Sequence, residues 1–428
     1  MSKNLNRSTH AAPAAPRDRR IVHLGLGAFH RAHQAWYTSR ASDGDRWGIT
    51  AYTGTRPDAA TALQAQDGLY TLIERSVVSD RAEIIDVITE AVDGADVAHL
   101  ERTLADSATA LVTLTITEAG YQPSTEPLRS TLHRLALGLE ARRLADAGPI
   151  ALVSCDNLPD NGSVLRAALA PHLEAIGRET AEWVASNASF VSTSVDRITP
   201  RTTAADLELA ESLTGLHDSC AVTTEPFSDW ILQGEFPAGR PAWETAGARF
   251  VQDLEPYERR KLWLLNGAHT LLAAAGPLRG HAFVDEAFGD PLLRQWVEDF
   301  WDAAARHLPS TLNTSEYRRA LTDRFANLSI RHELAQIATG VETKLRVRVV
   351  PVLNAELAAG RDGVSAARPI AAHLLATEQL DDTVTGIHKL EPNASETVLT
   401  SVSSALDELR TALDRGSLTP LTTHHEKG

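Results

Sequence analysis

The sequence predicts two domains, an α/β domain built on a mostly parallel sheet and a mainly α-helical domain after it. At 428 residues the chain is longer than the roughly 100–200 residues of a typical single domain. Its first half alternates short apolar, β-rich runs with helical stretches, the order expected of a parallel sheet covered by helices on both faces. From about Glu255 onward, segments rich in Ala, Leu, Glu and Arg dominate, and strand patterns almost vanish. We therefore expect a disordered lead-in over residues 1–20, an α/β domain over 21–252 and a helical domain over 253–428.

The α/β domain is expected to alternate strands and helices from residue 21 onward. Short apolar runs such as Ile21–Gly25 and Trp47–Thr53 have the length and composition of buried strands. Strands are expected over residues 21–25, 47–53, 110–117, 150–154 and 188–198, with further extended segments over 68–75 and 83–89. Helices are expected over residues 29–42, 57–65, 97–105 and 127–147.

In the second domain, long stretches without strand patterns or loop signals predict helices that pack on one another. They are expected over residues 258–275, 292–307, 315–325, 330–339, 349–359 and 401–414. The tail over residues 417–428 is expected to be frayed.

Composition excludes several classes of partner. The chain has 41 basic and 56 acidic residues, a net charge of −15, so the molecule as a whole repels nucleic acid and anionic membrane surfaces. Its two cysteines, Cys155 and Cys220, cannot form a disulfide framework or a Cys-rich zinc site. The N-terminus lacks the apolar segment of a signal peptide, and the most apolar stretch, 262–278, is interrupted by Asn266 and Pro277. We expect a cytoplasmic protein that is a monomer or a small homo-oligomer.

A glycine motif follows the first predicted strand. In Gly25-Leu26-Gly27 the glycines would let the backbone turn tightly and approach a pyrophosphate, as in a Rossmann-type domain. The third glycine of that motif would fall at His30, and the same pattern often marks only a tight turn. The acidic residue expected about 20 positions on is missing, whereas Arg56 stands there and could face the 2′-phosphate of NADP.

The longer string Gly25–Ala35 (GLGAFHRAHQA) is more specific, and it resembles the cofactor loop of the polyol-specific long-chain dehydrogenases. Further blocks of the resemblance follow in the same order over about residues 21–350. They are TITEAGY (115–121), SCDNLPDNG (154–162), VDRITP (195–200), EPF (225–227), GRP (239–241), KLWLLNGAH (261–269) and RFAN (324–327). The resemblance implies cofactor contacts at Leu24, Gly25, Gly27, Ala28, Phe29 and His30, with NAD favoured over NADP. Arg56 is a further candidate cofactor contact because of its place after the second predicted strand.

The KLWLLNGAH block carries polar residues at helical spacing. At about 100° per residue, Lys261, Asn266 and His269 fall near 0°, 140° and 80°, and Glu258 falls near 60°. A solvated stripe on an amphipathic helix is the alternative interpretation. That alternative predicts freely substitutable Lys, Glu and Arg, whereas this arc interleaves an Asn and a His with leucines.

Alcohol oxidation needs a base for the hydroxyl proton and hydrogen-bond donors for the developing alkoxide. A lysine can serve as base if burial lowers its pKa, and asparagine amides are neutral donors. The resemblance implies that Lys261 is the general base and that Asn266 and His269 bind substrate oxygens. It also implies that Asn157 is a second oxyanion donor and that Glu258 takes part in proton exit.

Three further residues are candidate substrate contacts. Asp196 lies in the VDRITP block, where the alternative is a strand-end cap. Arg324 and Lys344 match the family pattern and could meet substrate hydroxyls or a carboxylate, or form structural ion pairs. The family usually has a Pro after R-F-x-N and a D-G-S-x-K block, but this chain has Leu328 and the segment 340–346 (GVETKLR). These departures leave the substrate open.

The resemblance implies an NAD(P)-dependent, metal-independent secondary-alcohol dehydrogenase acting on an open-chain polyol or sugar acid. Interconversion of mannitol and fructose, interconversion of mannonate and fructuronate by a fructuronate reductase, and oxidation of D-arabinitol all remain open. Zinc-dependent alcohol oxidation is a rival mechanism, but its Cys₂His site would need both distant cysteines. A non-catalytic protein that senses dinucleotides is the alternative of a different class.

Overall fold

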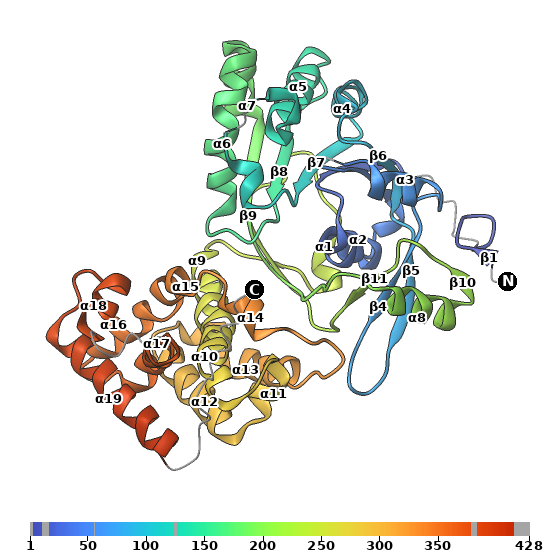
Figure 1. Ribbon diagram of the computed structural model, residues 1–428. Helices are drawn as coiled ribbons and strands as arrows, with labels where there is room; N and C mark the ends of the chain where they lie inside the picture. Colours follow the sequence, from blue (N-terminus) through green and yellow to red (C-terminus); the bar gives the residue numbers. More distant parts are fainter. Residues whose placement is uncertain (1–2, 11–16, 55, 124–125, 378–382, 415–428) are drawn as a thin grey trace, which may run out of the picture. The chain divides into compact units, whose positions relative to one another are not determined.

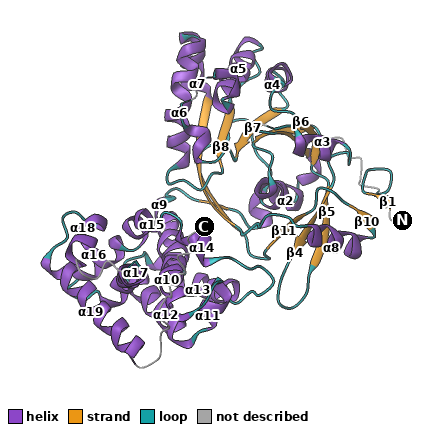
Figure 2. Ribbon diagram, viewed as in Figure 1, coloured by secondary structure: helices purple, strands orange, loops and turns teal. Residues whose placement is uncertain are grey.

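The structure is a computed structural model that describes residues 3–10, 17–54, 56–123, 126–377 and 383–414 (Figure 1). Internal contacts divide the chain into two units, Met1–Glu255 and Pro256–Gly428. Figure 2 shows both strands and helices in the first unit and helices in the second, which confirms the predicted α/β and helical fold classes. Each unit is described by itself below.

The first unit is built on an eight-stranded sheet. In spatial order its strands are β13 (Arg249–Phe250), β12 (Asp229–Gln233), β9 (Ala188–Asp196), β8 (Ile150–Ser154), β7 (Thr109–Leu114), β2 (Arg19–Leu24), β3 (Trp47–Tyr52) and β6 (Ile88–Val92). From β6 to β9 all pairings are parallel, whereas β12 runs antiparallel to β9. Read in chain order, these six parallel strands have the spatial order 3-2-1-4-5-6 of the doubly wound Rossmann fold.

Two apolar cores lie on opposite faces of this sheet. On one face the sheet packs against α4 (Val97–Leu104), α5 (Thr131–Leu144), α6 (Asn161–Ile176) and α7 (Arg178–Asn187), which stand together in Figure 1. On the other face it packs against α1 (Ala28–Ala32), α2 (Gln34–Arg40) and α3 (Asp58–Gln64). Neighbouring residues of one strand, such as Ala151 and Leu152 of β8, therefore enter different cores. Burial on both faces explains why these strands are continuous apolar runs.

The predicted helix over residues 29–42 is divided in the structure. His33 leaves the helical region (φ −123°, ψ −86°) between α1 and α2. Its ring packs against Phe29, Tyr37 and Trp230 at centroid distances of 5.0, 5.0 and 5.3 Å. Aromatic packing in the tertiary fold thus interrupts a segment whose local pattern is helical.

A second, three-stranded sheet has the order β11 (Val222–Thr224), β4 (Tyr70–Glu74), β5 (Arg81–Ile85). The extended segment predicted over residues 83–89 contributes to both sheets, since β5 pairs with β4 and β6 pairs with β3. The helix α8 (Ala204–Thr214) contacts β5 and β10 (Leu216–His217).

The expectation of a disordered lead-in is wrong for residues 3–10. The strand β1 (Lys3–Asn4) pairs in parallel with β10, and Leu5 is fully buried. Arg7 donates hydrogen bonds to the carbonyl oxygens of Asp67 (3.2 Å) and Asp86 (3.1 Å). These partners lie 60 and 79 residues away in the chain, so local composition could not indicate them. Residues 11–16 lie outside the described part.

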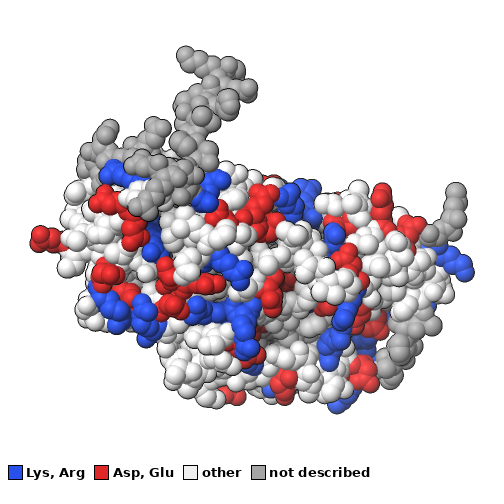
Figure 3. Space-filling view, turned by 90° about the horizontal axis from the view of Figure 1, so that it is seen from below, with Lys and Arg blue, Asp and Glu red and all other residues white. Residues whose placement is uncertain are grey.

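The second unit consists of packed helices. Those used below are α9 (Glu255–Arg260), α10 (Ala268–Ala275), α12 (Pro291–Ala305), α13 (Thr314–Phe325), α14 (Leu334–Ala338), α15 (Val341–Arg348), α16 (Val350–Ala358), α17 (Val364–Ala376), α18 (Thr383–Leu390) and α19 (Glu396–Asp414). Between α9 and α10, residues Lys261–Gly267 form a π-helix. Among the described residues, no helix is long and apolar enough to span a membrane. Figure 3 shows acidic and basic side chains interspersed on the face that it displays.

Candidate active site

A cavity of about 840 Å³ opens where β2, β3 and β7 end. The carboxyl ends of parallel strands meet at one edge of a sheet, and in this strand order the connections reverse direction between β2 and β7. Open α/β sheets bind their ligands at that switch point, and the volume suits a ligand the size of a dinucleotide. The cavity is lined by Gly25, Leu26, Thr53, Gly54, Arg56, Asp58, Ala59, Thr115, Ile116, Thr117, Ala119, Gly120, Gln122, Pro123, Arg129, Ser130 and Thr131.

The two glycines of the motif have different physical roles. Gly25 has φ +106°, and a Cβ atom there would overlap the carbonyl oxygen of Thr115, so the turn itself requires glycine. Gly27 precedes α1 in an extended conformation, and its Cβ would meet only the carbonyl oxygen of Gly25, at 3.6 Å. A side chain at Gly27 is therefore compatible with the fold and would occupy space next to the turn.

The side chains of the other predicted cofactor residues on β2 and α1 pack beneath the glycine turn. Leu24 is buried in the sheet core, and Ala28 and Phe29 pack against the core on the α1 side. His30 is fully buried, and its ring stacks on that of His23 at a centroid distance of 3.3 Å. Burial lowers the pKa of both imidazoles, to about 3 for His23, so both rings are neutral at neutral pH.

The end of β3 borders the cavity without a carboxylate at the expected position. Thr53 stands there, and its hydroxyl accepts the N–H of Gly94 at 2.9 Å. Arg56 lines the cavity, is largely exposed and lies 3.6 Å from the Asp58 carboxylate. Gly25 and Arg56, two of the residues predicted to contact the cofactor, line this cavity together with Asp58, which sequence reasoning did not single out.

The loop after β7 forms the wall of the cavity next to the glycine turn. The Asp156 carboxylate accepts the backbone N–H groups of Ile116 (3.1 Å) and Thr117 (2.7 Å) and the Tyr121 hydroxyl (2.7 Å). Burial raises the pKa of the Asp156 carboxyl above its ordinary value, against the opposing effect of these hydrogen bonds. The TITEAGY block contains this loop, yet sequence reasoning assigned none of its residues to the site. The strand was predicted over residues 110–117, whereas β7 ends at Leu114, so residues 115–117 belong to the loop. Their position at the carboxyl end of a predicted parallel strand was the signal that could have found them.

Two predicted residues of the first unit lie at strand ends. Asn157 is exposed in the turn after β8, and Asp196 is the last residue of β9 and is buried. The neighbouring Arg197 has a fully buried guanidinium that donates to Glu74 (2.6 Å) and to the carbonyl oxygen of Ala32 (2.7 Å). Arg197 thereby ties the strand that carries Asp196 to the end of α1.

In the second unit the π-helix carries Lys261 and Asn266, both half-buried. π-Helices have hydrogen bonds from i to i+5 and occur frequently at functional sites. The wider turn is supported from outside, because the Trp301 indole N–H donates to the carbonyl oxygen of Leu264 at 2.7 Å. At Gly267 a Cβ atom would lie 2.5 Å from the Phe300 ring, so glycine permits the close approach of α12.

One helical turn further on, His269 of α10 is buried against aromatic rings. Its ring lies 4.8 Å from that of Phe325 and 5.3 Å from that of His332. Arg324, the residue before Phe325 on α13, is also buried. Glu258 lies on α9, one turn before Lys261, and is half-buried.

Positive charge is concentrated on α15. Lys344 and Arg348 are half-buried and one turn apart, and burial lowers the pKa of each. The Lys344 ammonium donates to the carbonyl oxygen of Ile337 at 2.7 Å, and its charge also helps to lower the pKa of His332. One imidazole nitrogen of His332, Nδ1, is buried without a hydrogen-bond partner. Within the described ranges, no three His, Cys, Asp or Glu side chains lie together as metal ligands would.

The strand order and the cavity at the switch point place the first unit in the dinucleotide-binding class of α/β folds. Residues 19–245 match the mannitol dehydrogenase Rossmann domain, and residues 253–417 match the mannitol dehydrogenase C-terminal domain. The chain therefore belongs to the mannitol dehydrogenase family of oxidoreductases, which confirms the resemblance found in the sequence.

Individual relatives cover most of the chain. D-arabinitol 4-dehydrogenase of Ralstonia nicotianae is 37% identical over 374 residues, 81% of this chain and 80% of its own length. D-mannonate oxidoreductase of Escherichia coli is 33% identical over 411 residues, 88% of this chain and 84% of its own length. The structure of Pseudomonas fluorescens mannitol 2-dehydrogenase in a ternary complex with NAD and D-mannitol is 29% identical, with a TM-score of 0.79 over 97% of this chain and 98% of that chain.

Proposed function

We propose that the protein is an NAD-dependent dehydrogenase that oxidises a secondary hydroxyl of an open-chain polyol to a ketone, without a metal ion. The observation that carries the proposal is the cavity at the switch point of the sheet, with Gly25 and the loop after β7 at its wall. NAD is bound in the related Pseudomonas fluorescens structure, and the cavity here has the position and size for it.

The proposed chemistry assigns roles to Lys261, Asn266 and His269 of the KLWLLNGAH block, and to two residues outside it. Lys261 accepts the hydroxyl proton, for which its half-buried position on the π-helix is suitable because burial disfavours the ammonium. Asn266 and Asn157 donate neutral hydrogen bonds to the developing alkoxide, and His269 orients a substrate oxygen. Glu258 takes part in the exit of the proton that Lys261 has accepted. NAD, when bound, supplies the acceptor for the hydride that leaves the alcohol carbon.

A second candidate substrate class, the sugar acids, is favoured by the charge on α15. Burial is the main cause of the lowered pKa values of Lys344 and His332, and the neighbouring positive charges of Arg348 and Lys344 respectively add to it. A substrate carboxylate would relieve this repulsion. On this proposal the substrate that is oxidised is a hexonate, as the name of the D-mannonate oxidoreductase indicates for that relative.

A substrate panel tests both candidates. The chain is incubated with NAD or with NADP and one of five compounds, and reduction of the cofactor is followed by its absorbance. The compounds are mannitol, arabinitol, sorbitol, mannonate and altronate. We expect one of the polyols with NAD to give the highest kcat/KM, whereas a clear preference for a hexonate selects the second candidate. Loss of turnover after exhaustive chelation would refute the metal-independent mechanism. Binding of NAD without turnover of any compound would favour a dinucleotide sensor.

A further inference from the structure

The loop after β7 contains a non-glycine residue with a strained backbone. Thr117 has φ +63° and ψ +164°, a combination that glycine adopts readily and β-branched residues avoid. Thr117 lines the dinucleotide cavity, together with its neighbours Ile116 and Gly120. Such a conformation persists only where the surrounding structure imposes it, and strain of this kind clusters at ligand sites.

The Asp156 carboxylate imposes it. One carboxylate oxygen accepts the N–H of Ile116 and the other accepts the N–H of Thr117, so two successive peptide groups are held by one side chain. Asp156 follows β8, the strand next to β7, and is only 7% exposed. Hydrogen bonds to a charged, buried acceptor are stronger than those between neutral groups, which makes this carboxylate able to hold a strained backbone.

Tyr121 holds the other end of the same loop. Its hydroxyl donates to Asp156 at 2.7 Å and lies 2.8 Å from the Ser154 hydroxyl. Burial raises the pKa of the Tyr121 phenol, so the hydroxyl remains protonated and able to donate. Between these two anchors the N–H of Gly120 donates to the carbonyl oxygen of Thr117 at 2.9 Å and closes the turn.

We propose that Asp156 and Tyr121 are positioning residues for the dinucleotide, because they hold Thr117 in its strained conformation and so fix the cavity wall beside the glycine turn. The inference rests on the proposed function in that the ligand is NAD. The carbonyl oxygen of Asp156 also accepts the N–H of Leu158 and the side-chain amide of Asn161, both at 2.8 Å. Asp156 therefore fixes the turn that carries Asn157 as well.

Titration of NAD against the intact chain, followed by tryptophan fluorescence, tests the proposal. In Asp156→Asn the amide keeps one acceptor oxygen but turns its NH₂ group toward a backbone donor, so we expect the dissociation constant for NAD to rise at least about tenfold. Tyr121→Phe removes one of the three hydrogen bonds that the Asp156 carboxylate accepts, and it should raise the dissociation constant for NAD by about threefold or more. Adding Thr117→Gly to Asp156→Asn should recover most of the loss, because glycine adopts the required backbone without strain. Because relief of backbone strain also raises stability, the Tm of each variant is measured beside its dissociation constant for NAD.

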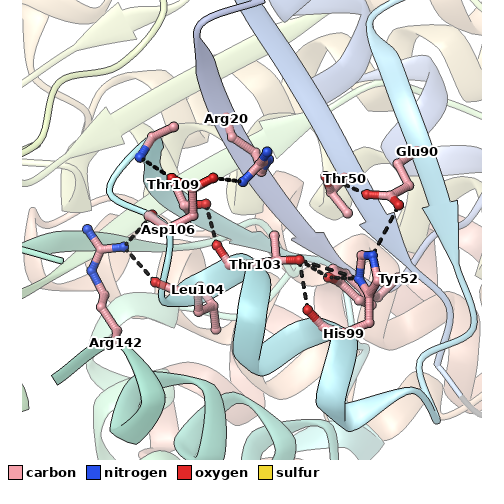
Figure 4. Close-up of polar contacts among 11 residues, drawn as sticks. Arg20, Thr50, Tyr52, Glu90, His99, Thr103, Leu104, Asp106, Thr109 and Arg142 are labelled. Carbon is pink, nitrogen blue, oxygen red and sulfur yellow. Dashed lines mark hydrogen bonds and ion pairs between the residues drawn. The ribbon is translucent and has the colours of Figure 1, made fainter. Parts of the chain in front are cut away.

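Figure 4 shows Tyr52 and Asp106, the residues changed in two control variants in the same unit. The Tyr52 hydroxyl lies 2.8 Å from His99 Nδ1 and donates to Thr103 at 2.9 Å, away from the cavity. Asp106 accepts hydrogen bonds from Arg20 (2.6 Å) and from the N–H of Ala108 (2.9 Å). Tyr52→Phe and Asp106→Asn therefore lose comparable hydrogen bonds. We expect both to lower the Tm while the dissociation constant for NAD stays within twofold of the parent value.

The outcomes separate this inference from the proposed function. A parent chain that binds no NAD refutes the proposed function, and the inference with it. If the parent binds NAD and both Asp156→Asn and Tyr121→Phe bind it equally well, the inference alone is overturned. Should Asp156→Asn fail to fold, Tyr121→Phe decides on the same criterion. Weakened binding that Thr117→Gly does not restore overturns the role of the strained backbone.

Discussion

Substitution of the two motif glycines should separate the stability of the turn from its function. Gly25→Ala forces a Cβ atom onto the Thr115 carbonyl at φ +106°, and a residue in such a region costs about 1–3 kcal/mol before the overlap is counted. We therefore expect Gly25→Ala to lower the free energy of unfolding by at least about 2 kcal/mol. For a unit of this size that corresponds to a fall in Tm of about 4–8 °C.

Gly27→Val should have the opposite profile. Its Cβ would have only one neighbour, at 3.6 Å, so the fold should tolerate the change with a loss of about 1 kcal/mol or less at this N-cap. The branched side chain would occupy the space where a pyrophosphate approaches the turn, and the dissociation constant for NAD should rise at least about tenfold. Calorimetric titration with NAD and thermal unfolding of the same samples measure both effects. If Gly27→Val folds and binds NAD as tightly as the parent, the glycine turn is not the pyrophosphate site.

Three other outcomes are expected. Lys261→Ala should lower kcat for alcohol oxidation by about 10²–10⁴-fold while NAD affinity is retained, and an added primary amine should restore part of the rate. Lys389→Ala is the matched control. If Lys261→Ala retains more than about a tenth of the parental turnover, Lys261 is not the general base. NAD should give a higher kcat/KM than NADP, because the Arg56 guanidinium lies beside the Asp58 carboxylate; a preference for NADP of about tenfold or more, lost in Arg56→Ala, would contradict this. Burial alone would raise the pKa of Glu356 above its ordinary value of 4.5. Hydrogen bonds from the side chains of Arg306, His307 and Arg361 lower this pKa to about 2. Its stabilising contribution is therefore complete above about pH 4.5 and is lost as the pH falls toward 2, so Glu356→Gln should lose less stability than the parent between about pH 5 and pH 3 in acid-unfolding curves.

Strands that appear in the sequence as short, continuous apolar runs were predicted well. The strand β8 was predicted over its observed residues, and β3 was predicted one residue too long. Both are short and buried on two faces, so their apolar runs are unambiguous. The helices α6 and α17 were not predicted, and each contains a proline, Pro171 and Pro369. Proline is a sound local signal for a break, but packing of the surrounding turns outweighs one lost hydrogen bond.

The residues of the candidate site also fall into those that local sequence could predict and those that it could not. Gly25 could be predicted because its requirement is local, a turn directly after a strand. Thr117 could not, because its conformation depends on Asp156, 39 residues further along the chain. No spacing in the sequence shows which carboxylate will reach which peptide group. Residues whose geometry is imposed by distant partners are therefore the part of the site that only the structure shows.

The π-helix changes the argument for Lys261 itself. Angles counted at about 100° per residue place Lys261 and Asn266 about 140° apart, on different parts of the helix surface. In a π-helix the hydrogen bonds join residues i and i+5, so residues five apart come nearly above one another, as residues four apart do in an α-helix. The proposed base and the proposed alkoxide donor thus share a face more closely than the sequence arithmetic indicated. The Trp301 hydrogen bond to Leu264 and the contact of Gly267 with Phe300 both come from α12. We infer that packing by α12, rather than the propensity of KLWLLNGAH, determines the π-helix and with it the alignment of Lys261 and Asn266.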